Sequence, residues 1–430
     1  MNKVIDKTSY VLQSVATGHT FEDSGWMLDP QGENAPSLVR AIYKEKQLNV
    51  KDDSFGIYKF ADWLPIGRTL AGSSAPITYK SEQLAKELNL SNLYVTFTGW
   101  WPERGAYNRT CSFKETEAYS VCGRLTDSSK TLVVASAGNT ARAFAKVCSD
   151  NHISLILCVP EDNLDALWFD APLNDCVKLI CPKKGADYFD AINLSNLVSQ
   201  LDGYITEGGA KNIARRDGMG TTMLSAATFI GRIPDYYFQA VGSGTGAIAA
   251  WEANLRLIGD GRFGGGKAKL MVSQNAPFTP MFDAWKVDSR ALLPMDDDDA
   301  RKKVETIIAK VLSNRKPPYS LAGGLFDALK DAGGDFLVAT NGEACAASEL
   351  FEKLEGIDIH PASAIAVASL INEAKSGRID KDATIMLNIT GGGEKRYKSE
   401  HQLFYLKPSA VFDFNPSLDE VKQTLAQIDK

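Results

Sequence analysis

The sequence predicts an α/β protein in which helices cover a mainly parallel β-sheet. Three observations support this class. Short apolar runs with the length of a buried strand recur through the middle of the chain, turns rich in glycine and other small residues follow several of them, and segments with helical periodicity come next. The length of 430 residues suits two or three domains, or one large domain with an insertion.

A strand–turn–helix alternation begins near residue 131. TLVVA at 131–135 has the composition of a buried strand, SAGNT at 136–140 is a predicted turn, and ARAFAKVCSD at 141–150 is a predicted helix with one apolar face. The other predicted strands lie at 153–159, 177–181, 203–206, 235–241, 269–273, 335–340 and 384–390. The other predicted helices lie at 189–201, 212–231, 328–332, 343–354 and 363–374.

The acidic run Asp296–Asp299 precedes the segment ARKKVETIIAKVL at 300–312. Apolar residues of this segment repeat at helical spacing: Val304, Ile307, Ile308, Val311 and Leu312. We therefore interpret the aspartates as the first turn of a helix, where the macrodipole favours negative charge, in preference to a calcium site. Residues 313–323 are a predicted loop.

Composition narrows the classes of function. Forty-seven basic and 53 acidic residues give a net charge of −6, which offers no large basic field for nucleic acid and favours a small-molecule enzyme. No apolar run reaches the length of a membrane helix and no secretory or transit signal is visible, so we expect a cytoplasmic protein. The seven cysteines form no C-x-x-C pair and the four histidines are isolated, so we expect reduced thiols and no metal site.

The segment TCSFKE at 110–115 contains a candidate reactive lysine. Ser112 and Glu115 have the spacing of a capping box, which would place Lys114 in the first turn of a helix. The positive end of the helix dipole disfavours an ammonium group, and a lysine with a lowered pKa can form a Schiff base. A solvated surface lysine is the alternative interpretation.

Three further segments end predicted strands, where ligands of α/β proteins bind. SAGNT could hold a carboxylate with its amides, with Asn139 adding a side-chain contact, although a plain helix cap also fits. GSGTG at 242–246 opens a predicted helix and suits a phosphate. Its match to a dinucleotide fingerprint is disfavoured because Asp260 lies in a glycine-rich loop. NITGGG at 388–393 places Thr390 beside flexible glycines, or is a plain turn.

Together the four segments resemble the fold type II pyridoxal-phosphate enzymes, which include threonine synthase, O-acetylserine sulfhydrylase and the serine and threonine dehydratases. The glycine-rich loop follows the lysine of S-F-K by about 130 residues, as in that group. Over about residues 40–400, the segments GWWPERGAYNRTCSFKE, EGGAKNIARRDGMGT and GIDIHPASAIAVASL are similar to those of the cysteate synthases.

The resemblance implies roles for individual residues. Lys114 would hold pyridoxal 5'-phosphate as a Schiff base and later remove the substrate α-proton. Asn139 would bind the phenolic oxygen of the cofactor and Thr390 its pyridine nitrogen. The cofactor phosphate would lie on the amides of Gly242, Ser243, Gly244, Thr245 and Gly246, and the substrate carboxylate on Ser136, Ala137, Gly138 and Thr140. Cationic candidates for anionic substrates are Arg109, Lys211, Arg215 and Arg216, each of which also fits a surface charge.

The pyridine partner indicates a reaction type. A neutral hydroxyl such as that of Thr390 cannot keep the ring protonated, so the ring is a weaker electron sink and loss of a β leaving group is favoured. The expected reaction is β-elimination or β-replacement through an aminoacrylate. The resemblance implies O-phospho-L-serine as the donor and sulfite as the nucleophile, which would give L-cysteate and phosphate. The alternatives are threonine synthase acting on O-phosphohomoserine, a serine or threonine dehydratase, and a non-catalytic sensor of a phosphorylated amino acid.

The resemblance also implies an architecture like that of the tryptophan synthase β-subunit. Two α/β domains with parallel sheets would enclose the cofactor in the cleft between them, and the protein would be a homodimer. We expect residues 41–101 and 205–430 to form the large domain, 102–204 a small mobile domain, and 1–40 a segment of uncertain fold. No cysteine precedes Cys111, so the zinc-ribbon-like start of some relatives is not expected.

Overall fold

The computed structural model describes residues 7–136, 138–186 and 188–428. Its larger body is built on a six-stranded sheet with the order β15-β14-β13-β16-β5-β4. Neighbouring strands are parallel except for the pair β4 and β5. The strands are β4 (Ile77–Lys80), β5 (Asn92–Phe97), β13 (Tyr236–Ala240), β14 (Lys269–Asn275), β15 (Asp335–Ala339) and β16 (Thr384–Ile389).

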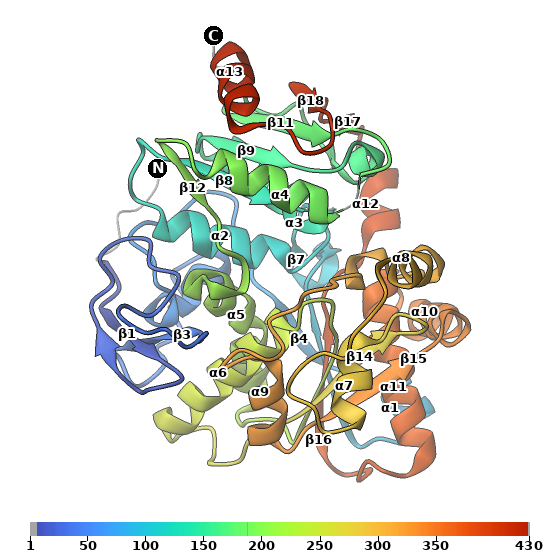
Figure 1. Ribbon diagram of the computed structural model, residues 1–430. Helices are drawn as coiled ribbons and strands as arrows, with labels where there is room; N and C mark the ends of the chain where they lie inside the picture. The colour runs from blue at the N-terminus through green and yellow to red at the C-terminus, as the bar shows by residue number, and fades with distance from the viewer. Residues whose placement is uncertain (1–6, 137, 187, 429–430) are drawn as a thin grey trace.

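Helices cover both faces of this sheet (Figure 1). On β13, Tyr237 packs in a core with helices α5 (Ile213–Ile230), α6 (Thr245–Asp260) and α9 (Leu325–Ala332). Its neighbour Phe238 packs in a second core with α10 (Asn341–Glu355) and α11 (Pro361–Ser376). Successive strand residues point to opposite faces, which explains why strands buried on both sides are continuously apolar. The same body contains α1 (Gln83–Glu87), α7 (Pro280–Lys286) and α8 (Asp297–Thr306).

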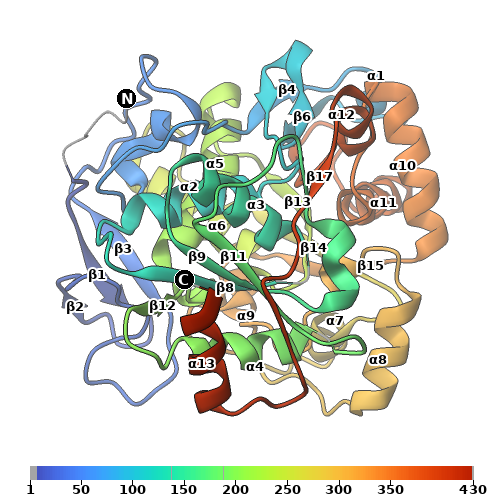
Figure 2. The same ribbon diagram turned by 90° about the horizontal axis from the view of Figure 1, so that it is seen from above.

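The second body contains a five-stranded parallel sheet with the order β12-β8-β9-β11-β18. Its strands are β8 (Thr131–Ala135), β9 (Leu155–Cys158), β11 (Val177–Pro182), β12 (Tyr204–Thr206) and β18 (Ala410–Phe412). Helices α2 (Lys114–Arg124) and α3 (Asn139–Asp150) share a core with one face, and α4 (Tyr188–Val198) and α13 (Leu418–Ile428) share one with the other. Figure 2 shows this sheet from above, with α4 and α13 beside each other.

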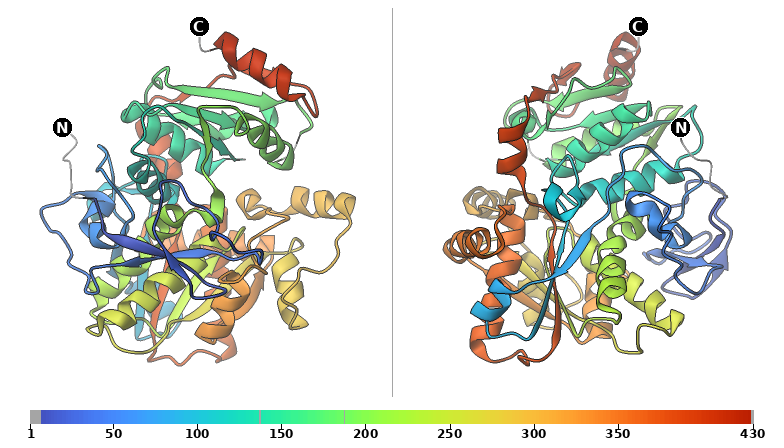
Figure 3. Two further views of the ribbon diagram at one scale, coloured as in Figure 1. Left: turned by 60° about the vertical axis from the view of Figure 1, so that its left-hand side comes forward. Right: turned by 180° about the vertical axis from the view of Figure 1, so that it is seen from behind.

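The C-terminal segment differs from the predicted division of the chain. Residues 205–430 were expected in the large domain, but β18 pairs with β11, and α13 packs on α4. Figure 3 shows the segment running from the larger body to the smaller one. Phe412, Val421 and Leu425 are buried in the core that α4 shares with this sheet. The tail therefore covers an edge strand that would otherwise be open. Along the way lie α12 (Glu394–Glu400) and β17 (Phe404–Tyr405), which pairs with β10 (Trp168–Phe169).

The N-terminal segment forms a small antiparallel sheet, for which the sequence showed no clear period. Its strands are β1 (Tyr10–Ser14), β2 (Thr20–Phe21) and β3 (Val39–Tyr43). Leu12 and Val39 lie in the same core as helices α5 and α6. The segment is thus packed on the larger body. A short hairpin, β6 (Trp100–Trp101) and β7 (Ala106–Tyr107), leads towards α2.

Most predicted strands and helices are confirmed, including 131–135, 177–181, 235–241 and 384–390. The acidic helix start is also confirmed, because the Asp296 side chain accepts hydrogen bonds from two amides of the first turn. The predicted helix at 300–312 is too long: α8 ends at Thr306. Asn341 accounts for the end, since its amide donates to Thr306 O (2.8 Å) and accepts from Ile308 N (3.1 Å). Across the described ranges, we find no helix that is both long and apolar enough to span a membrane.

Candidate active site

A pocket lies between the two sheets, and most of the predicted site residues line it. Its lining includes Lys114, Ser136, Gly138, Asn139, Thr140, Arg215, Gly242, Ser243, Gly244, Thr245, Gly246 and Thr390. These residues follow the carboxyl ends of β8, β13 and β16 or lie in the first turns of helices α2, α3, α5 and α6. Carboxyl ends of parallel strands are where α/β proteins bind ligands, so the topology explains the convergence. Ala137 lies outside the described residues.

Lys114 is the first residue of α2, and its side chain is 19% exposed. Burial lowers the pKa of its amine, and the positive charge of Arg215 lowers it further, while Glu117 opposes the shift. The predicted lowered pKa is confirmed. The predicted capping box is wrong, because the Glu115 carboxylate accepts a hydrogen bond from the Thr110 amide. Burial is the largest cause of the lowered pKa, and it makes this lysine a better nucleophile.

A chain of buried charges surrounds Lys114. Its Nζ lies 3.2 Å from Glu117 Oε2, and Glu117 is fully buried. Arg215 Nη2 lies 3.2 Å from Glu117 Oε1, and Arg215 Nη1 lies 2.6 Å from Glu207 Oε2. Burial raises the pKa of Glu207, although Arg215 opposes this. Sequence reasoning missed both glutamates; the spacing of Glu117 three residues after Lys114, on the same helical face, was the available signal.

The SAGNT segment opens helix α3. Ser136 Oγ accepts a hydrogen bond from the Gly138 amide (3.1 Å), and the helix begins at Asn139. Asn139 Oδ1 accepts a hydrogen bond from Arg142 Nη2 (2.9 Å), so the amide is already oriented by the protein. Amides at the start of a long helix, together with the Ser136 and Thr140 hydroxyls, provide donors for a carboxylate.

The GSGTG loop connects β13 to α6 and approaches its neighbours closely. A Cβ on Gly242 would lie 2.7 Å from Val311 O, and one on Gly246 would lie 2.6 Å from Gln239 Nε2. Gly244 has φ +80°, a left-handed conformation that favours glycine. The Ser243 and Thr245 hydroxyls are 2.8 Å apart. A helix N-terminus whose preceding loop carries no Cβ at three positions is suited to a phosphate group.

Thr390 follows β16, and its carbonyl accepts a hydrogen bond from the Phe113 amide (2.9 Å). This bond connects the end of β16 to the start of α2, and so places Thr390 near Lys114. Gln239, on β13, also lines the pocket and was not predicted. Its side-chain oxygen accepts a hydrogen bond from Asn388 Nδ2 (3.1 Å). A glutamine inside the otherwise apolar strand YYFQA was the signal that could have identified it.

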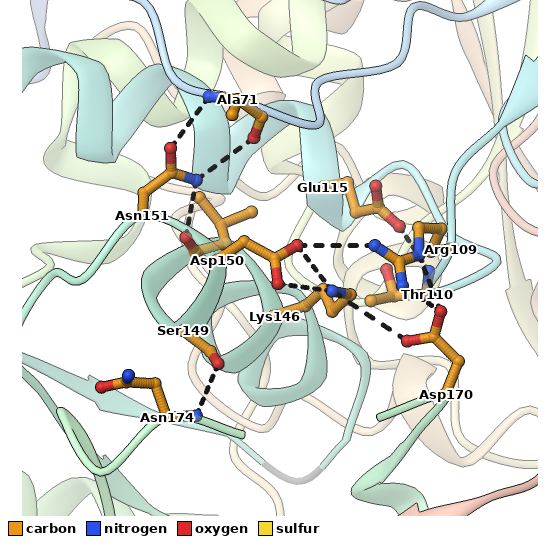
Figure 4. A network of polar contacts seen from close by, with 11 residues as sticks. Ala71, Arg109, Thr110, Glu115, Lys146, Ser149, Asp150, Asn151, Asp170 and Asn174 are labelled. Carbon is orange, nitrogen blue, oxygen red and sulfur yellow. Dashed lines mark hydrogen bonds and ion pairs between the residues drawn. The ribbon is translucent and has the colours of Figure 1, made fainter. Parts of the chain in front are cut away.

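Arg109, a predicted substrate-binding residue, belongs to a different network. Figure 4 shows its guanidinium between two carboxylates of the smaller body. Arg109 Nε lies 2.9 Å from Asp170 Oδ2, and its Nη1 lies 3.6 Å from Asp150 Oδ2. Lys146 contacts the same Asp150 at 2.6 Å. Arg109 is absent from the described pocket lining, and its guanidinium pairs with Asp150, the last residue of α3, and with Asp170.

Lys211 and Arg216 are likewise absent from the described part of the pocket lining. Lys211 pairs with Asp29 at 2.6 Å on the exposed surface. Arg216 is fully buried, where it pairs with Glu252 at 2.8 Å and donates to Val39 O and Ala210 O. Of the four predicted cations, only Arg215 is in the described pocket lining. Its neighbour Arg216 on α5 points elsewhere, because a helix points consecutive side chains about 100° apart.

Two other segments line the pocket without having been predicted. Residues 310–314 reach it because α8 ends at Thr306, and His360 reaches it from the residue before α11. The end of α8 depends on Asn341 and on Asn275, whose Oδ1 accepts from Ala309 N at 3.1 Å. These are long-range contacts that no local pattern encodes.

The residues fit a pyridoxal-phosphate group. A buried amine of lowered pKa, an amide donor and a hydroxyl face the same pocket as a glycine loop at a helix N-terminus. The loop has no side chain at the three positions where a Cβ would strike protein atoms at 2.6–2.7 Å. Such a set can hold one ligand through a covalent bond at one end and a phosphate at the other.

Comparison with known proteins agrees with this fit. The family described as pyridoxal-phosphate dependent enzyme matches residues 81–391. Cysteate synthase of Methanosarcina acetivorans is 50% identical over 394 residues, which cover 91% of this chain and 94% of that protein. Cysteate synthase of Methanocorpusculum labreanum is 46% identical over 397 residues, with coverage of 91% and 94%.

Solved structures show the same fold. Maize serine racemase has a TM-score of 0.58 at 14% identity, covering 76% of this chain and 91% of that one. The processed form of threonine deaminase isoform 2 from Solanum lycopersicum has a TM-score of 0.53 at 17% identity, covering 75% and 82%. The predicted fold class is confirmed by these similarities and by the two parallel-stranded sheets.

Proposed function

Since the chain belongs to the pyridoxal-phosphate-dependent enzymes and, within them, to the cysteate synthases, we propose that it makes L-cysteate from O-phospho-L-serine and sulfite. In this reaction the Cβ–O bond of the donor breaks and phosphate leaves with the electron pair. The sulfur lone pair of sulfite forms the new Cβ–S bond. The proton taken from Cα is returned to it, so no oxidant or reductant is needed.

The observation that supports the proposal is that a single pocket brings Lys114 together with the glycine loop 242–246. Lys114 Nζ would hold the carbonyl end of the cofactor, and the loop amides would hold its phosphate. Asn139 and Thr390 would bind its phenolic oxygen and its ring nitrogen. When bound, pyridoxal phosphate withdraws electrons from Cα of the amino acid and so acidifies the Cα proton.

The side chains of this enzyme would then carry out three tasks. Lys114 Nζ accepts the Cα proton and later returns it, which a lowered pKa assists because more of the amine is neutral. The start of helix α3, with Ser136, Gly138 and Thr140, binds the α-carboxylate. Arg215, at the pocket wall beside Glu207, is a cation available for the phosphate of the donor.

The substrates are anions, whereas the protein carries a net charge of −6. A global field of that sign repels them, so binding depends on local donors. The structure has such donors at the starts of α3 and α6 and at Arg215. A neutral hydroxyl at Thr390 also fits elimination of a β group better than chemistry that needs a protonated ring.

Product analysis tests this proposal. The purified enzyme is incubated with O-phosphoserine or O-phosphohomoserine, each with and without sulfite, and amino-acid products are separated by chromatography. We expect cysteate and phosphate only from O-phosphoserine with sulfite. Threonine from O-phosphohomoserine would indicate a threonine synthase, and ammonia with pyruvate alone would indicate a dehydratase; either result contradicts the proposal.

We also propose that the enzyme is a homodimer whose smaller body, which combines strands of the predicted domain 102–204 with β18 and α13, closes over the substrate. The similarity to the fold type II enzymes supports both statements. Light scattering of the purified enzyme measures the mass directly. Small-angle scattering with and without O-phosphoserine measures closure, for which we expect a smaller radius of gyration in the presence of the donor.

A further inference from the structure

His360 is the only histidine in the described lining of the pocket, and the proposed reaction assigns it no task. It lies directly before helix α11, and its side chain is 11% exposed. Its amide donates to Gly391 O (3.0 Å), beside Thr390. A Cβ on Gly391 would lie 2.9 Å from His360 Nδ1, so the glycine allows the ring to rest against this backbone.

The two ring nitrogens of His360 have different neighbours. Nε2 lies 2.7 Å from Glu394 Oε2, and Nδ1 lies 3.5 Å from Asn139 Nδ2. Burial raises the pKa of Glu394, but contacts with His360 and Arg142 bring it below its ordinary value, so this group is a carboxylate. A carboxylate only accepts, and its negative charge 2.7 Å from Nε2 favours a hydrogen on that nitrogen, so we take Nδ1 of the neutral ring as the acceptor.

The orientation of the Asn139 amide follows from an independent contact. Arg142 Nη2 donates to Asn139 Oδ1 at 2.9 Å, and a guanidinium has no acceptor, so the amide oxygen faces Arg142. Arg142 is itself fixed by bonds to Ala166 O (2.8 Å) and Thr110 O (3.1 Å). The amide nitrogen of Asn139 therefore faces His360 Nδ1, which is the nitrogen assigned above as an acceptor.

The contacts of Asn139 with Arg142 and with His360 imply the same orientation of its side-chain amide. An amide nitrogen carries two hydrogens, and the one that does not point to His360 can serve a ligand of the pocket. A flipped amide would instead present its oxygen to the ligand and its nitrogen to Arg142. An oxygen facing the phenolic oxygen of the cofactor would repel it, so the arrangement around Asn139 decides between attraction and repulsion.

We propose that His360, held by Glu394, is a positioning residue that orients the Asn139 amide so that its N–H group faces the phenolic oxygen of the cofactor. The orientation of Asn139 by His360 does not depend on the cofactor, whereas the contact of that amide with the cofactor rests on the proposed function. One measurement tests the orientation and a second tests the contact.

The first measurement uses the cofactor-free protein. Nitrogen NMR of histidine-labelled protein at mildly alkaline pH, with His360→Leu to assign the signal, reports which ring nitrogen carries the hydrogen. We expect the hydrogen on Nε2. A hydrogen on Nδ1 would overturn the proposal, because Nδ1 could not then accept from Asn139, and this result holds whether or not the enzyme makes cysteate.

The second measurement is a double-mutant cycle on the dissociation constant for pyridoxal phosphate, followed by visible absorption. We expect His360→Leu to raise the constant roughly tenfold and to move the visible band, and we expect the same of Asn139→Ala. In the Asn139→Ala background, His360→Leu should change the constant less than about twofold, because a residue that acts through Asn139 has nothing left to orient.

Additive effects in this cycle would overturn the proposal, since they would mean that His360 acts on the cofactor independently or through general folding. His360→Asn is the conservative variant: its amide oxygen can accept at the position of Nδ1 and should restore most of the affinity and the band position. His19→Leu, an exposed histidine of the N-terminal segment, is the matched control and should leave both unchanged. A wild-type protein without a chromophore would instead contradict the proposed function.

Discussion

The two walls of the pocket present donors to a ligand in different ways. The wall built on α2 and α5 uses charged side chains, with Lys114 and Arg215 each paired to a buried glutamate. The wall built on the loop 242–246 uses backbone amides at the start of α6 and places small residues there. Charged groups cost desolvation free energy and need partners, whereas amides at a helix start are directed by the fold itself.

The difference indicates which part of the chemistry each wall serves. A proton acceptor must change its charge during the reaction, so its pKa has to be adjusted by surrounding groups, as burial and Arg215 do for Lys114. A phosphate anchor must not change, so fixed dipoles are sufficient. Substitutions in the charged wall should therefore change catalysis and the pKa of Lys114, whereas substitutions in the glycine wall should change the affinity for the cofactor phosphate.

The largest effect is expected at Lys114. Lys114→Ala should lower cysteate formation by about 1,000-fold or more, because it removes both the covalent attachment and the proton acceptor. Borohydride reduction followed by mass spectrometry should lose the cofactor adduct on the peptide that contains residue 114. Lys86→Ala, on the exposed surface of α1, is the control and should keep both. Retention of cysteate synthesis by Lys114→Ala would refute the assignment of this wall.

Arg215 and Arg216 are adjacent on α5, but Arg215 lines the pocket and Arg216 is buried beside Glu252, so their variants should have different effects. Arg216→Gln should lower the free energy of unfolding by about 3–5 kcal/mol, because it removes a fully buried guanidinium and leaves the buried Glu252 paired with Arg40 alone. Arg215→Gln should lose less stability but raise the pKa of Lys114, since Arg215 lowers it. Urea unfolding and the pH dependence of borohydride trapping measure these effects. Equal losses of stability would show that Arg215 is also a core residue.

Glu115 provides a pH test of the region behind the lysine wall. Burial raises its pKa from 4.5 to about 7, while Thr110 and Lys146 oppose this shift. The folded protein therefore binds this proton more tightly than the unfolded chain does. The resulting stability is present in full below about pH 4.5 and is lost as the pH rises through about 7.

Glu115→Gln keeps a neutral side chain and should escape this loss. Relative to wild type, the variant should gain up to about 3 kcal/mol between pH 4.5 and pH 8. Urea unfolding at both pH values measures the gain. A difference between the two proteins that does not vary with pH would show that Glu115 has an ordinary pKa.

The smallest effect is expected on the glycine wall. Gly244→Ala places a Cβ 2.7 Å from Leu325 Cδ2 at a left-handed position, and should raise the dissociation constant for pyridoxal phosphate about tenfold. Pyridoxal, which lacks the phosphate, should be affected less. Gly259→Ala lies on the same helix with nothing within 4 Å of the new Cβ, so its affinity should not change. Equal weakening for both ligands would mean that the loop does not bind the phosphate.

Local sequence patterns predicted much of the fold. Buried strands such as 131–135 and 384–390 were recognisable because parallel strands covered on both faces are continuously apolar. The glycine loop and Lys114 were recognisable because each depends on a short segment. By contrast, β18 and α13 were placed in the wrong body, because their partners β11 and α4 lie more than 200 residues away in the chain.

The candidate site shows the same limit. The four cations were selected from their segments alone, yet only Arg215 lines the described pocket; Arg109 and Arg216 pair instead with Asp170 and Glu252, each more than 30 residues away. The pocket residues at 310–314 and His360 were missed because long-range contacts bring them there.

The sequence by itself determined the fold class, the family and the local ligand-binding segments, because hydrophobic periodicity and short motifs act within a few residues. Only the tertiary structure decided which charges face the pocket, which carboxylates accompany them and how the Asn139 amide is turned. The pKa of a buried group and the direction of a hydrogen bond depend on neighbours in space, and the order of residues along the chain does not specify those neighbours.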